Sequence, residues 1–312
     1  MSRLTVAVAQ PEVAANVGKA LDICVEYARN AAARDASLIV FPETWLPGYP
    51  IWLDVTRDVA LWDHAPTKDV YARYAGNSVV VGGAETTRLA VLAEELSLTI
   101  VVGISERVDE GPGNGTLYNT LLTFTPDGRL ANHHRKLVPT YTERMVWGLG
   151  DASGLRAVDT PHGRVGGLVC WEHWMPLARQ ALHESGEAIH VAVWPTVHEM
   201  HQVASRHYAF EGRCFVLAAG SVMRASALPP ELERHPVMAT SDDTWVMRGG
   251  SVIIAPNGSY VAGPVFEEPT LLVADIDLED VRREQMTLDV SGHYARPDVL
   301  SFSVRRERRD DH

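Results

Sequence analysis

Short segments that are almost continuously apolar constrain the fold of this chain most strongly. Residues 165–169 and 189–194 consist mainly of Val, Ala, Gly, Leu and Ile. A strand with one face in water would alternate apolar and polar side chains, whereas these segments require burial on both faces. Such strands are typical of layered α/β proteins, in which helices cover the faces of a sheet.

Segments with helical spacing alternate with the predicted strands. Residues 16–34 carry apolar side chains every three or four positions, which predicts an amphipathic helix. Further helices are predicted at 88–96, 176–185 and 203–212. Strands are predicted at 4–9, 38–41, 99–104, 117–125, 130–135, 165–169, 189–194, 215–219, 250–255 and 271–275.

Two turn sequences join neighbouring predicted strands. Pro126-Asp127-Gly128 separates 117–125 from 130–135, and Pro256-Asn257-Gly258 lies between 250–255 and 271–275. Proline fixes φ in such a turn and glycine accepts a positive φ, so each is expected to reverse the chain. No linker rich in Pro, Gly or Ser divides the sequence. We therefore predict one domain over residues 1–300, followed by a charged, solvated tail at 301–312.

Composition excludes several classes of protein. The chain is 46% hydrophobic and 22% charged, as in folded soluble proteins, and it has no apolar run of the ~18 residues that a membrane helix needs. Its net charge of −12 argues against nucleic acid as a partner. Three cysteines are too few for a disulfide framework, and the first ten residues alternate like a strand, unlike a signal peptide. We expect a protein of the reducing cytoplasm.

Cys170 is the first candidate for chemistry. It closes the predicted strand 165–169 and precedes the predicted helix 176–185, so it is expected at the mouth of the sheet, where ligands bind. A thiol near a helix N-terminus is expected to have a lowered pKa, which favours the nucleophilic thiolate. The alternative is an inert, buried cysteine.

Three charged residues also follow predicted strands or lie close behind them. Glu43 sits among aromatic residues and prolines, where partial desolvation would raise its pKa and suit it to general base catalysis. Lys136 ends a strand and could present a cation to developing negative charge. Glu143 follows nearby. The alternatives are a surface-loop glutamate, a solvated lysine, and a salt bridge of Glu143 to Arg144 or another base.

A histidine pair resembles a zinc motif but has the wrong spacing. His198 and His201 stand three positions apart, one fewer than the helical zinc motif requires, and the glutamate is not at the proper place. A zinc hydrolase therefore remains only an alternative, and no metal is predicted.

Several longer motifs together resemble the nitrilase superfamily of carbon-nitrogen hydrolases, and its nitrilase branch in particular. The resemblance extends in the right order over residues 4–300. Trp174 departs from the Tyr, Leu or Phe that is more common at its position. The motifs that carry the resemblance are Phe41-Pro42-Glu43, His134-Arg135-Lys136-Leu137-Val138-Pro139-Thr140, Tyr141-Thr142-Glu143-Arg144, Cys170-Trp171-Glu172-His173-Trp174-Met175-Pro176-Leu177 and Gly292-His293-Tyr294-Ala295-Arg296-Pro297-Asp298.

The resemblance implies an α/β fold in the form of an αββα sandwich that pairs with a second subunit. It also implies a catalytic triad of Glu43, Lys136 and Cys170, with Glu143 as a second carboxylate. The expected activity is hydrolysis of a small organic nitrile to a carboxylic acid and ammonia. The thiol and the general base supply this chemistry, so no cofactor is expected.

Substrate contacts are predicted for Trp171, Tyr49, Trp194 and His173, and the assembly is expected to be a homodimer or a larger homo-oligomer. Two other functions stay open. The first is an amidase or carbamoylase of the same superfamily, which shares the triad. The second is a catalytically silent scaffold that binds partners, although the presence of all three triad residue types counts against it.

Overall fold

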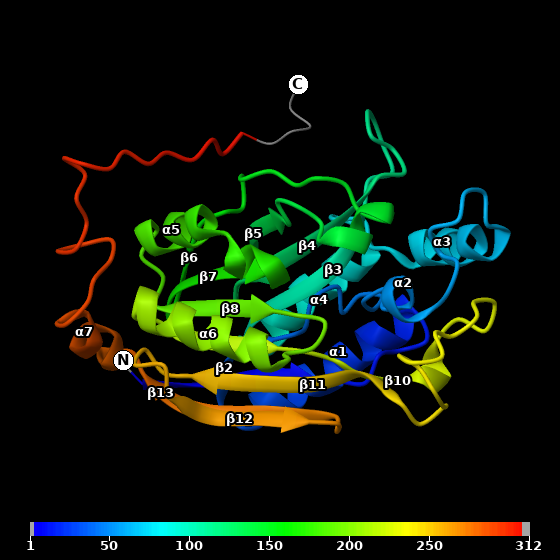
Figure 1. Ribbon diagram of the computed structural model, residues 1–312. Coiled ribbons are helices and arrows are strands. Elements are labelled where there is room, and N and C mark those ends of the chain that lie inside the picture. The colour runs from blue at the N-terminus through cyan, green and yellow to red at the C-terminus, as the bar shows by residue number, and fades with distance from the viewer. Residues whose placement is uncertain (1–2, 308–312) are drawn as a thin grey trace.

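Side chains of β1 (Arg3–Gln10) alternate between two hydrophobic cores. Val6 and Val8 point into a core shared with the second sheet, whereas Ala7 and Ala9 face a core built with helices. The strand is therefore buried on both faces, as its continuous apolar character requires. The computed structural model describes residues 3–307 and arranges them in four layers, helix, sheet, sheet and helix (Figure 1).

The first sheet has the order β13-β1-β2-β3-β4-β5. β1, β2 and β3 are parallel, and β13, β4 and β5 add antiparallel neighbours at its two sides. The other strands of this sheet are β2 (Ala36–Val40), β3 (Thr99–Arg107), β4 (Leu117–Phe124), β5 (Leu130–Arg135) and β13 (Thr270–Asp277).

The second sheet has the order β10-β11-β9-β8-β7-β6, with β12 paired to β11. Its centre, β7-β8-β9, is parallel. The strands are β6 (Val158–Thr160), β7 (Gly163–Val169), β8 (Ile189–Val193), β9 (Phe215–Ala219), β10 (Val222–Arg224), β11 (Trp245–Ile254) and β12 (Tyr260–Phe266).

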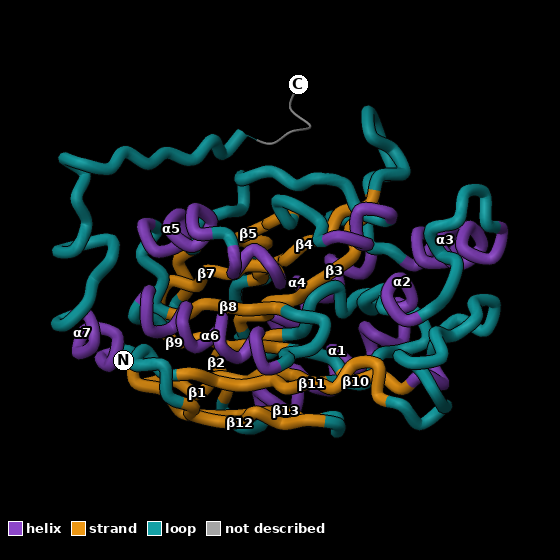
Figure 2. Tube along the Cα trace, viewed as in Figure 1, coloured by secondary structure: helices purple, strands orange, loops and turns teal. Residues whose placement is uncertain are grey.

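Helices cover the outer face of each sheet (Figure 2). α1 (Val17–Ala32) and α4 (Ala84–Glu95) pack on the first sheet, and α5 (Pro176–Glu184) and α6 (Glu199–Gly212) pack on the second. The side chain of Asn16 caps α1 by accepting a hydrogen bond from the Lys19 N–H at 3.0 Å. Shorter helices are α2 (Trp52–Val55), α3 (Ala65–Asn77) and α7 (Glu279–Gln285), with 3₁₀ turns η1 (Tyr141–Met145), η2 (Cys170–Trp174) and η3 (Ala225–Ala227).

The α/β class, the αββα layers and the single domain agree with the sequence-based predictions. Every predicted strand and helix is present, with ends shifted by a few residues. One connection was predicted wrongly: the turn Pro256-Asn257-Gly258 joins β11 to β12, and β13 pairs with β1 instead. Gly263 and Pro264 interrupt the pattern of β12, which hid this strand.

α3 was also missed, because only Val70 of this mostly polar helix is buried and no apolar stripe marks it. The described part of the tail, residues 301–307, has no regular secondary structure, and residues 308–312 lie outside the described residues. Within residues 3–307, no helix combines the length and apolar character needed to cross a membrane.

Candidate active site

Cys170 occupies a sharp bend between β7 and η2. Its backbone has φ +51°, in the left-handed region that residues other than glycine rarely adopt. Glu172 holds this bend in place, since its carboxylate accepts hydrogen bonds from the backbone N–H of Val169 at 2.7 Å and of Leu137 at 2.8 Å. The bend is thus tied to the segment that follows β5, and sequence analysis had assigned Glu172 no such role.

The Cys170 thiol is buried, and its pKa differs from the sequence-based expectation. Burial raises the pKa well above the usual thiol value, the Glu43 carboxylate raises it further, and Lys136 and the Trp171 N–H oppose this rise. The lowered pKa predicted from the helix N-terminus is therefore wrong for the resting protein, because the desolvation of the thiolate outweighs the local dipole. The sulfur is protonated at neutral pH and needs a base before it can attack.

Glu43 follows β2 and is fully buried beside the thiol. Its Oε1 accepts hydrogen bonds from Asn119 Nδ2 at 2.6 Å and Lys136 Nζ at 3.0 Å, whereas Oε2 has no hydrogen-bond partner among residues 3–307. Burial raises the pKa of Glu43 to about 7, with a contribution from Glu143, although Lys136 and Asn119 favour the ionised form. One oxygen is held, and the other is free to take a proton.

Gly103 on β3 allows the Glu43 segment to pass close to the sheet. A Cβ atom at this position would lie 2.3 Å from the Pro42 carbonyl oxygen and 2.5 Å from the Thr44 backbone nitrogen. The Leu46 N–H also donates to the Gly103 carbonyl at 3.2 Å. Only glycine leaves room for this crossing, which places Glu43 above the ends of the strands.

Lys136 lies between two carboxylates. Its Nζ is 3.0 Å from Glu43 Oε1 and 2.7 Å from Glu143 Oε2. Burial alone would lower the pKa of Lys136, but the nearby Glu43, Cys170 and Glu143 raise it above its ordinary value. The side chain therefore stays an ammonium ion although it is buried.

Glu143 is fixed from three directions. Besides Lys136, it accepts hydrogen bonds from the Thr140 backbone N–H at 2.8 Å and from the Tyr49 hydroxyl at 2.9 Å. Arg144, the partner considered from the sequence, donates instead to the Pro139 carbonyl. The capping contact to Thr140 holds Glu143 at the start of η1 and so orients the carboxylate towards Lys136.

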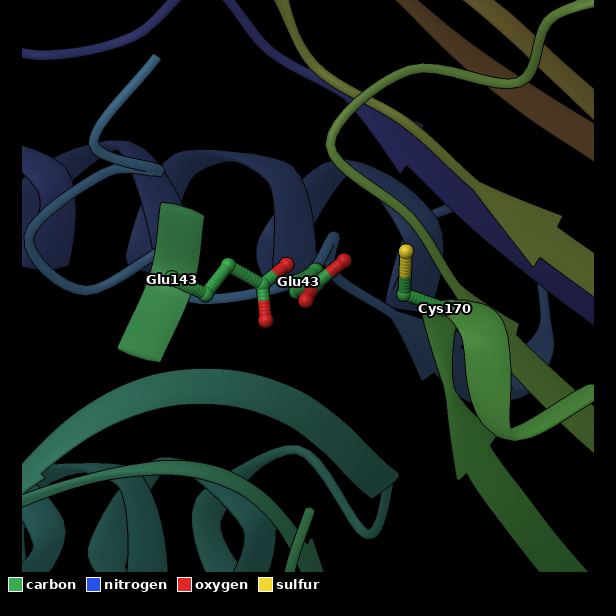
Figure 3. A group of neighbouring side chains, drawn as sticks. All are labelled: Glu43, Glu143 and Cys170. Atoms are coloured by element: carbon green, nitrogen blue, oxygen red, sulfur yellow. The ribbon is translucent and has the colours of Figure 1, made fainter. Parts of the chain in front are cut away.

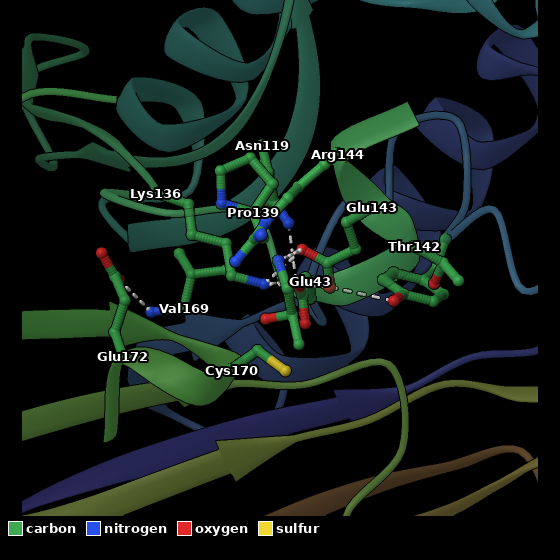
Figure 4. A network of polar contacts seen from close by, with 12 residues as sticks. Glu43, Asn119, Lys136, Pro139, Thr142, Glu143, Arg144, Val169, Cys170 and Glu172 are labelled. Carbon is green, nitrogen blue, oxygen red and sulfur yellow. Dashed lines mark hydrogen bonds and ion pairs between the residues drawn. The ribbon is translucent and has the colours of Figure 1, made fainter. Parts of the chain in front are cut away.

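The four side chains predicted to be catalytic therefore lie in one cluster, of which Figure 3 shows Glu43, Glu143 and Cys170. A carboxylate oxygen of Glu43, a carboxylate oxygen of Glu143 and the Cys170 sulfur all lie within 4.8 Å of one another. Figure 4 shows the hydrogen bonds and ion pairs that join Lys136 to both carboxylates. Glu43, Glu143 and Cys170 are a donor set that could surround a metal ion. The Lys136 ammonium, however, already supplies positive charge beside both carboxylates.

The four predicted substrate contacts lie in different surroundings. Tyr49 reaches the cluster through Glu143, and Trp171 is 53% exposed beside Cys170. His173 and Trp194 are instead buried in the core that Cys170 borders, with their rings stacked at a centroid distance of 4.7 Å. Contact of any of these side chains with a substrate stays a prediction.

The zinc alternative finds no support in the geometry. His201 is engaged elsewhere, since its Nδ1 lies 2.8 Å from the Thr196 carbonyl oxygen and its ring stacks on Trp194 at 4.4 Å. Among residues 3–307, the group of His, Cys, Asp and Glu side chains close enough to hold a metal is the cluster around Cys170, and it contains neither His198 nor His201.

The other two cysteines are buried in the hydrophobic cores, and we predict that they serve only packing. Cys24 accepts a hydrogen bond from Trp45 Nε1 at 3.0 Å inside the α1 core, and Cys214 is fully buried beside β9. Burial raises the pKa of both thiols. Replacing either with Ala should leave kcat within about threefold of wild type, because only packing is lost. Loss of activity in a folded Cys214→Ala protein would mean that a second thiol takes part.

Comparisons with known proteins agree with this geometry. A sequence profile of the family described as carbon-nitrogen hydrolase matches residues 5–284. An aliphatic nitrilase from Sinorhizobium fredii (strain HH103) is 39% identical over 309 residues, covering 98% of this chain and 97% of the relative. A bifunctional nitrilase/nitrile hydratase from Nicotiana tabacum is 39% identical, with 91% of this chain and 81% of the relative covered.

A solved structure shares the fold. The crystal structure of a carbon-nitrogen hydrolase from Helicobacter pylori G27 superposes with a TM-score of 0.71, covering 95% of this chain and 96% of that chain at 17% sequence identity. The profile match over nearly the whole chain and the 39% identical relative identify the protein as a member of the carbon-nitrogen hydrolase family.

Proposed function

We propose that the protein is a nitrilase, which hydrolyses an organic nitrile with two waters to a carboxylic acid and ammonia. The observation that carries the proposal is the cluster itself: the Cys170 thiol, a carboxylate oxygen of Glu43 that has no hydrogen-bond partner among residues 3–307, and the Lys136 ammonium. The aliphatic nitrilase that is 39% identical over nearly the full length supports a nitrile as substrate.

The first step is addition of the thiol to the nitrile. Glu43 takes the proton from Cys170 as the sulfur attacks the nitrile carbon, so one carbon–sulfur bond forms and one carbon–nitrogen π bond opens. Negative charge develops on the nitrogen, where Lys136 and the Trp171 N–H can stabilise it. Return of the proton from Glu43 to this nitrogen gives a neutral thioimidate.

Hydrolysis of the thioimidate needs a base again. Glu43 deprotonates a water that attacks the thioimidate carbon and passes the proton to the nitrogen, which gives a tetrahedral intermediate with a hydroxyl and an amino group. Glu43 then moves the hydroxyl proton to the same nitrogen, which leaves as ammonia as the carbonyl forms and the carbon–nitrogen bond breaks. A thioester remains on Cys170. A second water, also activated by Glu43, displaces the thiol and releases the acid. Glu143 keeps Lys136 in place through both stages.

The tetrahedral intermediate formed when water attacks the thioimidate can also break down to a second product. The name of one relative gives a reason to test for this product. If the carbon–sulfur bond breaks before the carbon–nitrogen bond, the product is the amide and the free thiol is regenerated. The Nicotiana tabacum relative is described as a bifunctional nitrilase/nitrile hydratase. Amide release is therefore the second candidate outcome for this protein.

A panel of aliphatic, aryl and arylacetonitrile substrates tests the proposal. We expect ammonia and acid from at least one class, with amide as a minor product, and no turnover by a folded Cys170→Ala variant. Each nitrile should be paired with its own amide. Faster ammonia release from the amide would reassign the protein as an amidase, and formation of neither ammonia nor amide from any substrate would favour a binding scaffold.

Self-association is a further proposal, supported by apolar side chains near the nucleophile. On and next to α5, Leu177 is 69% exposed and Trp174 is 40% exposed, and Met200, Val203 and Phe210 are exposed on α6. Exposed apolar groups gathered on two neighbouring helices favour an interface. We expect a homodimer or a modest homo-oligomer. A light-scattering mass equal to one chain of 34.3 kDa would contradict this.

We also propose a reducing cytoplasm as the place of action. Cys24, Cys170 and Cys214 are all free and buried, and a thiol nucleophile is preserved where disulfides are reduced. No cofactor enters the proposed steps.

A further inference from the structure

The peptide group between Cys170 and Trp171 adjoins the nucleophile at one end and a buried histidine at the other. Its N–H, from Trp171, opposes the rise in the pKa of the Cys170 thiol. Its carbonyl oxygen, from Cys170, lies 2.7 Å from Nδ1 of His173. Because the two bonding groups belong to one planar unit, the contact at the carbonyl fixes where the N–H points.

A buried series of hydrogen bonds determines which nitrogen of His173 carries the proton. The Cys170 carbonyl can only accept, so His173 Nδ1 must be the donor. His173 Nε2 lies 3.0 Å from His190 Nε2, and His190 Nδ1 lies 2.9 Å from Glu187 Oε2. Burial lowers the pKa of His173 well below the usual histidine value, so its ring is neutral and its Nε2 accepts from His190.

Glu187, the member of this hydrogen-bonded series farthest from Cys170, carries a negative charge. Burial alone would raise the pKa of Glu187, but His190 and His183 outweigh it and lower the value to about 2. Tyr208 also donates its hydroxyl hydrogen to Glu187. Glu187 Oε2 is the hydrogen-bond partner of His190 Nδ1 and so fixes this ring, whose Nε2 faces the Nε2 of His173. The other tautomer of His173 would leave the Cys170 carbonyl without its donor.

We infer that His173 is a positioning residue for the nucleophile: it orients the Cys170–Trp171 peptide so that the Trp171 N–H faces the sulfur and the substrate atom bonded to it. The inference rests on the proposed function and replaces the predicted contact of His173 with substrate. The Cys170 backbone requires such support, because φ +51° is strained for a residue with a side chain. Arg179 holds His173 in turn by donating to its carbonyl oxygen at 3.0 Å.

Two substitutions of His173 test the shape of its ring separately from the N–H group that donates to the Cys170 carbonyl. His173→Phe keeps a ring that can stack on Trp194 but removes the donor to the Cys170 carbonyl. His173→Asn places an amide N–H₂ where Nδ1 stood and cannot adopt a wrong tautomer. We expect kcat on the best nitrile to fall about 10²-fold in His173→Phe, as for loss of an aligned charge-stabilising donor, with KM little changed. His173→Asn should recover kcat to within about tenfold of wild type.

The role of the buried series is tested by combining substitutions. His190→Phe should lower kcat about tenfold in the wild-type background, because His173 is no longer held in the donating tautomer. In the His173→Asn background, the same change should alter kcat less than about twofold, since the asparagine needs no such partner. Equal losses in both backgrounds would overturn the tautomer assignment.

A readout without substrate keeps this inference separate from the proposed function. At fixed pH, the rate of Cys170 alkylation by iodoacetamide reports how well the thiolate is stabilised, and peptide mass analysis identifies the modified cysteine. We expect slower alkylation in His173→Phe and recovery in His173→Asn. The matched control is His201→Phe, which changes a histidine stacked on the same Trp194 and should alkylate at the wild-type rate.

Wild-type kcat and alkylation in His173→Phe, or a His173→Asn protein as impaired as His173→Phe, would refute the positioning role. If wild type turns over no nitrile but the alkylation pattern holds, the proposed function fails and the positioning role survives.

Discussion

Glu43→Gln is expected to lower kcat by at least ~10²–10⁴, the largest loss that we anticipate from a change that preserves shape. The amide can still bond to Asn119, but it cannot accept the thiol proton at the position of Oε2. Steady-state ammonia release with the best nitrile measures the effect. The control is Glu184→Gln on the exposed surface of α5, which should retain wild-type activity.

The pH profile gives this substitution a second signature. A general base works when deprotonated, and burial raises the pKa of Glu43 to about 7. In wild type, kcat/KM should therefore be low at acid pH and rise as the pH increases through about 7. Glu43→Gln should lose this acid limb. A limb that persists unchanged in the variant would assign the titration, and the base, to another group.

Lys136→Met is expected to lower kcat by ~10²–10³, because methionine fills similar space without the charge that stabilises the transition state. The change also leaves Glu43 and Glu143 facing each other without a cation, so thermal unfolding should be recorded beside activity. Lys19→Met, on the exposed surface of α1, is the control.

The two losses should not add. Glu43 and Lys136 act on the same thiol chemistry, so the double variant Glu43→Gln, Lys136→Met should be little worse than the poorer single variant. Multiplied losses would indicate that the two residues serve independent steps and would break the proposed triad.

Local patterns predicted much of the fold and the approximate place of the site. The continuous apolar character of β7 and β8 required burial on both faces, and the position of Cys170 directly after β7 placed it at the mouth of the sheet. Glu43 and Lys136 were likewise expected at strand ends. These predictions succeed because local sequence patterns determine where a strand is buried and where it ends.

Properties that depend on distant residues could not be predicted in this way. The direction of the Cys170 pKa shift follows from complete burial beside Glu43, which outweighs the dipole that the sequence suggested. Asn119 lies on β4 and reaches Glu43 across the sheet, and nothing in its own segment distinguishes it from a structural asparagine. The hydrogen bonds that join His173 to His190, and His190 to Glu187, could not be predicted either, because both partners lie outside the segment of His173.

The central claim is covalent catalysis by Cys170, and peptide mass spectrometry after an acid quench during turnover tests it most directly. An imidoyl adduct adds the whole mass of the nitrile to the thiol, and an acyl adduct adds the acid less one water. We expect one of these adducts on Cys170 in wild type and none on any residue in Cys170→Ala. An adduct on Cys24 or Cys214, or steady turnover in Cys170→Ala, would contradict it.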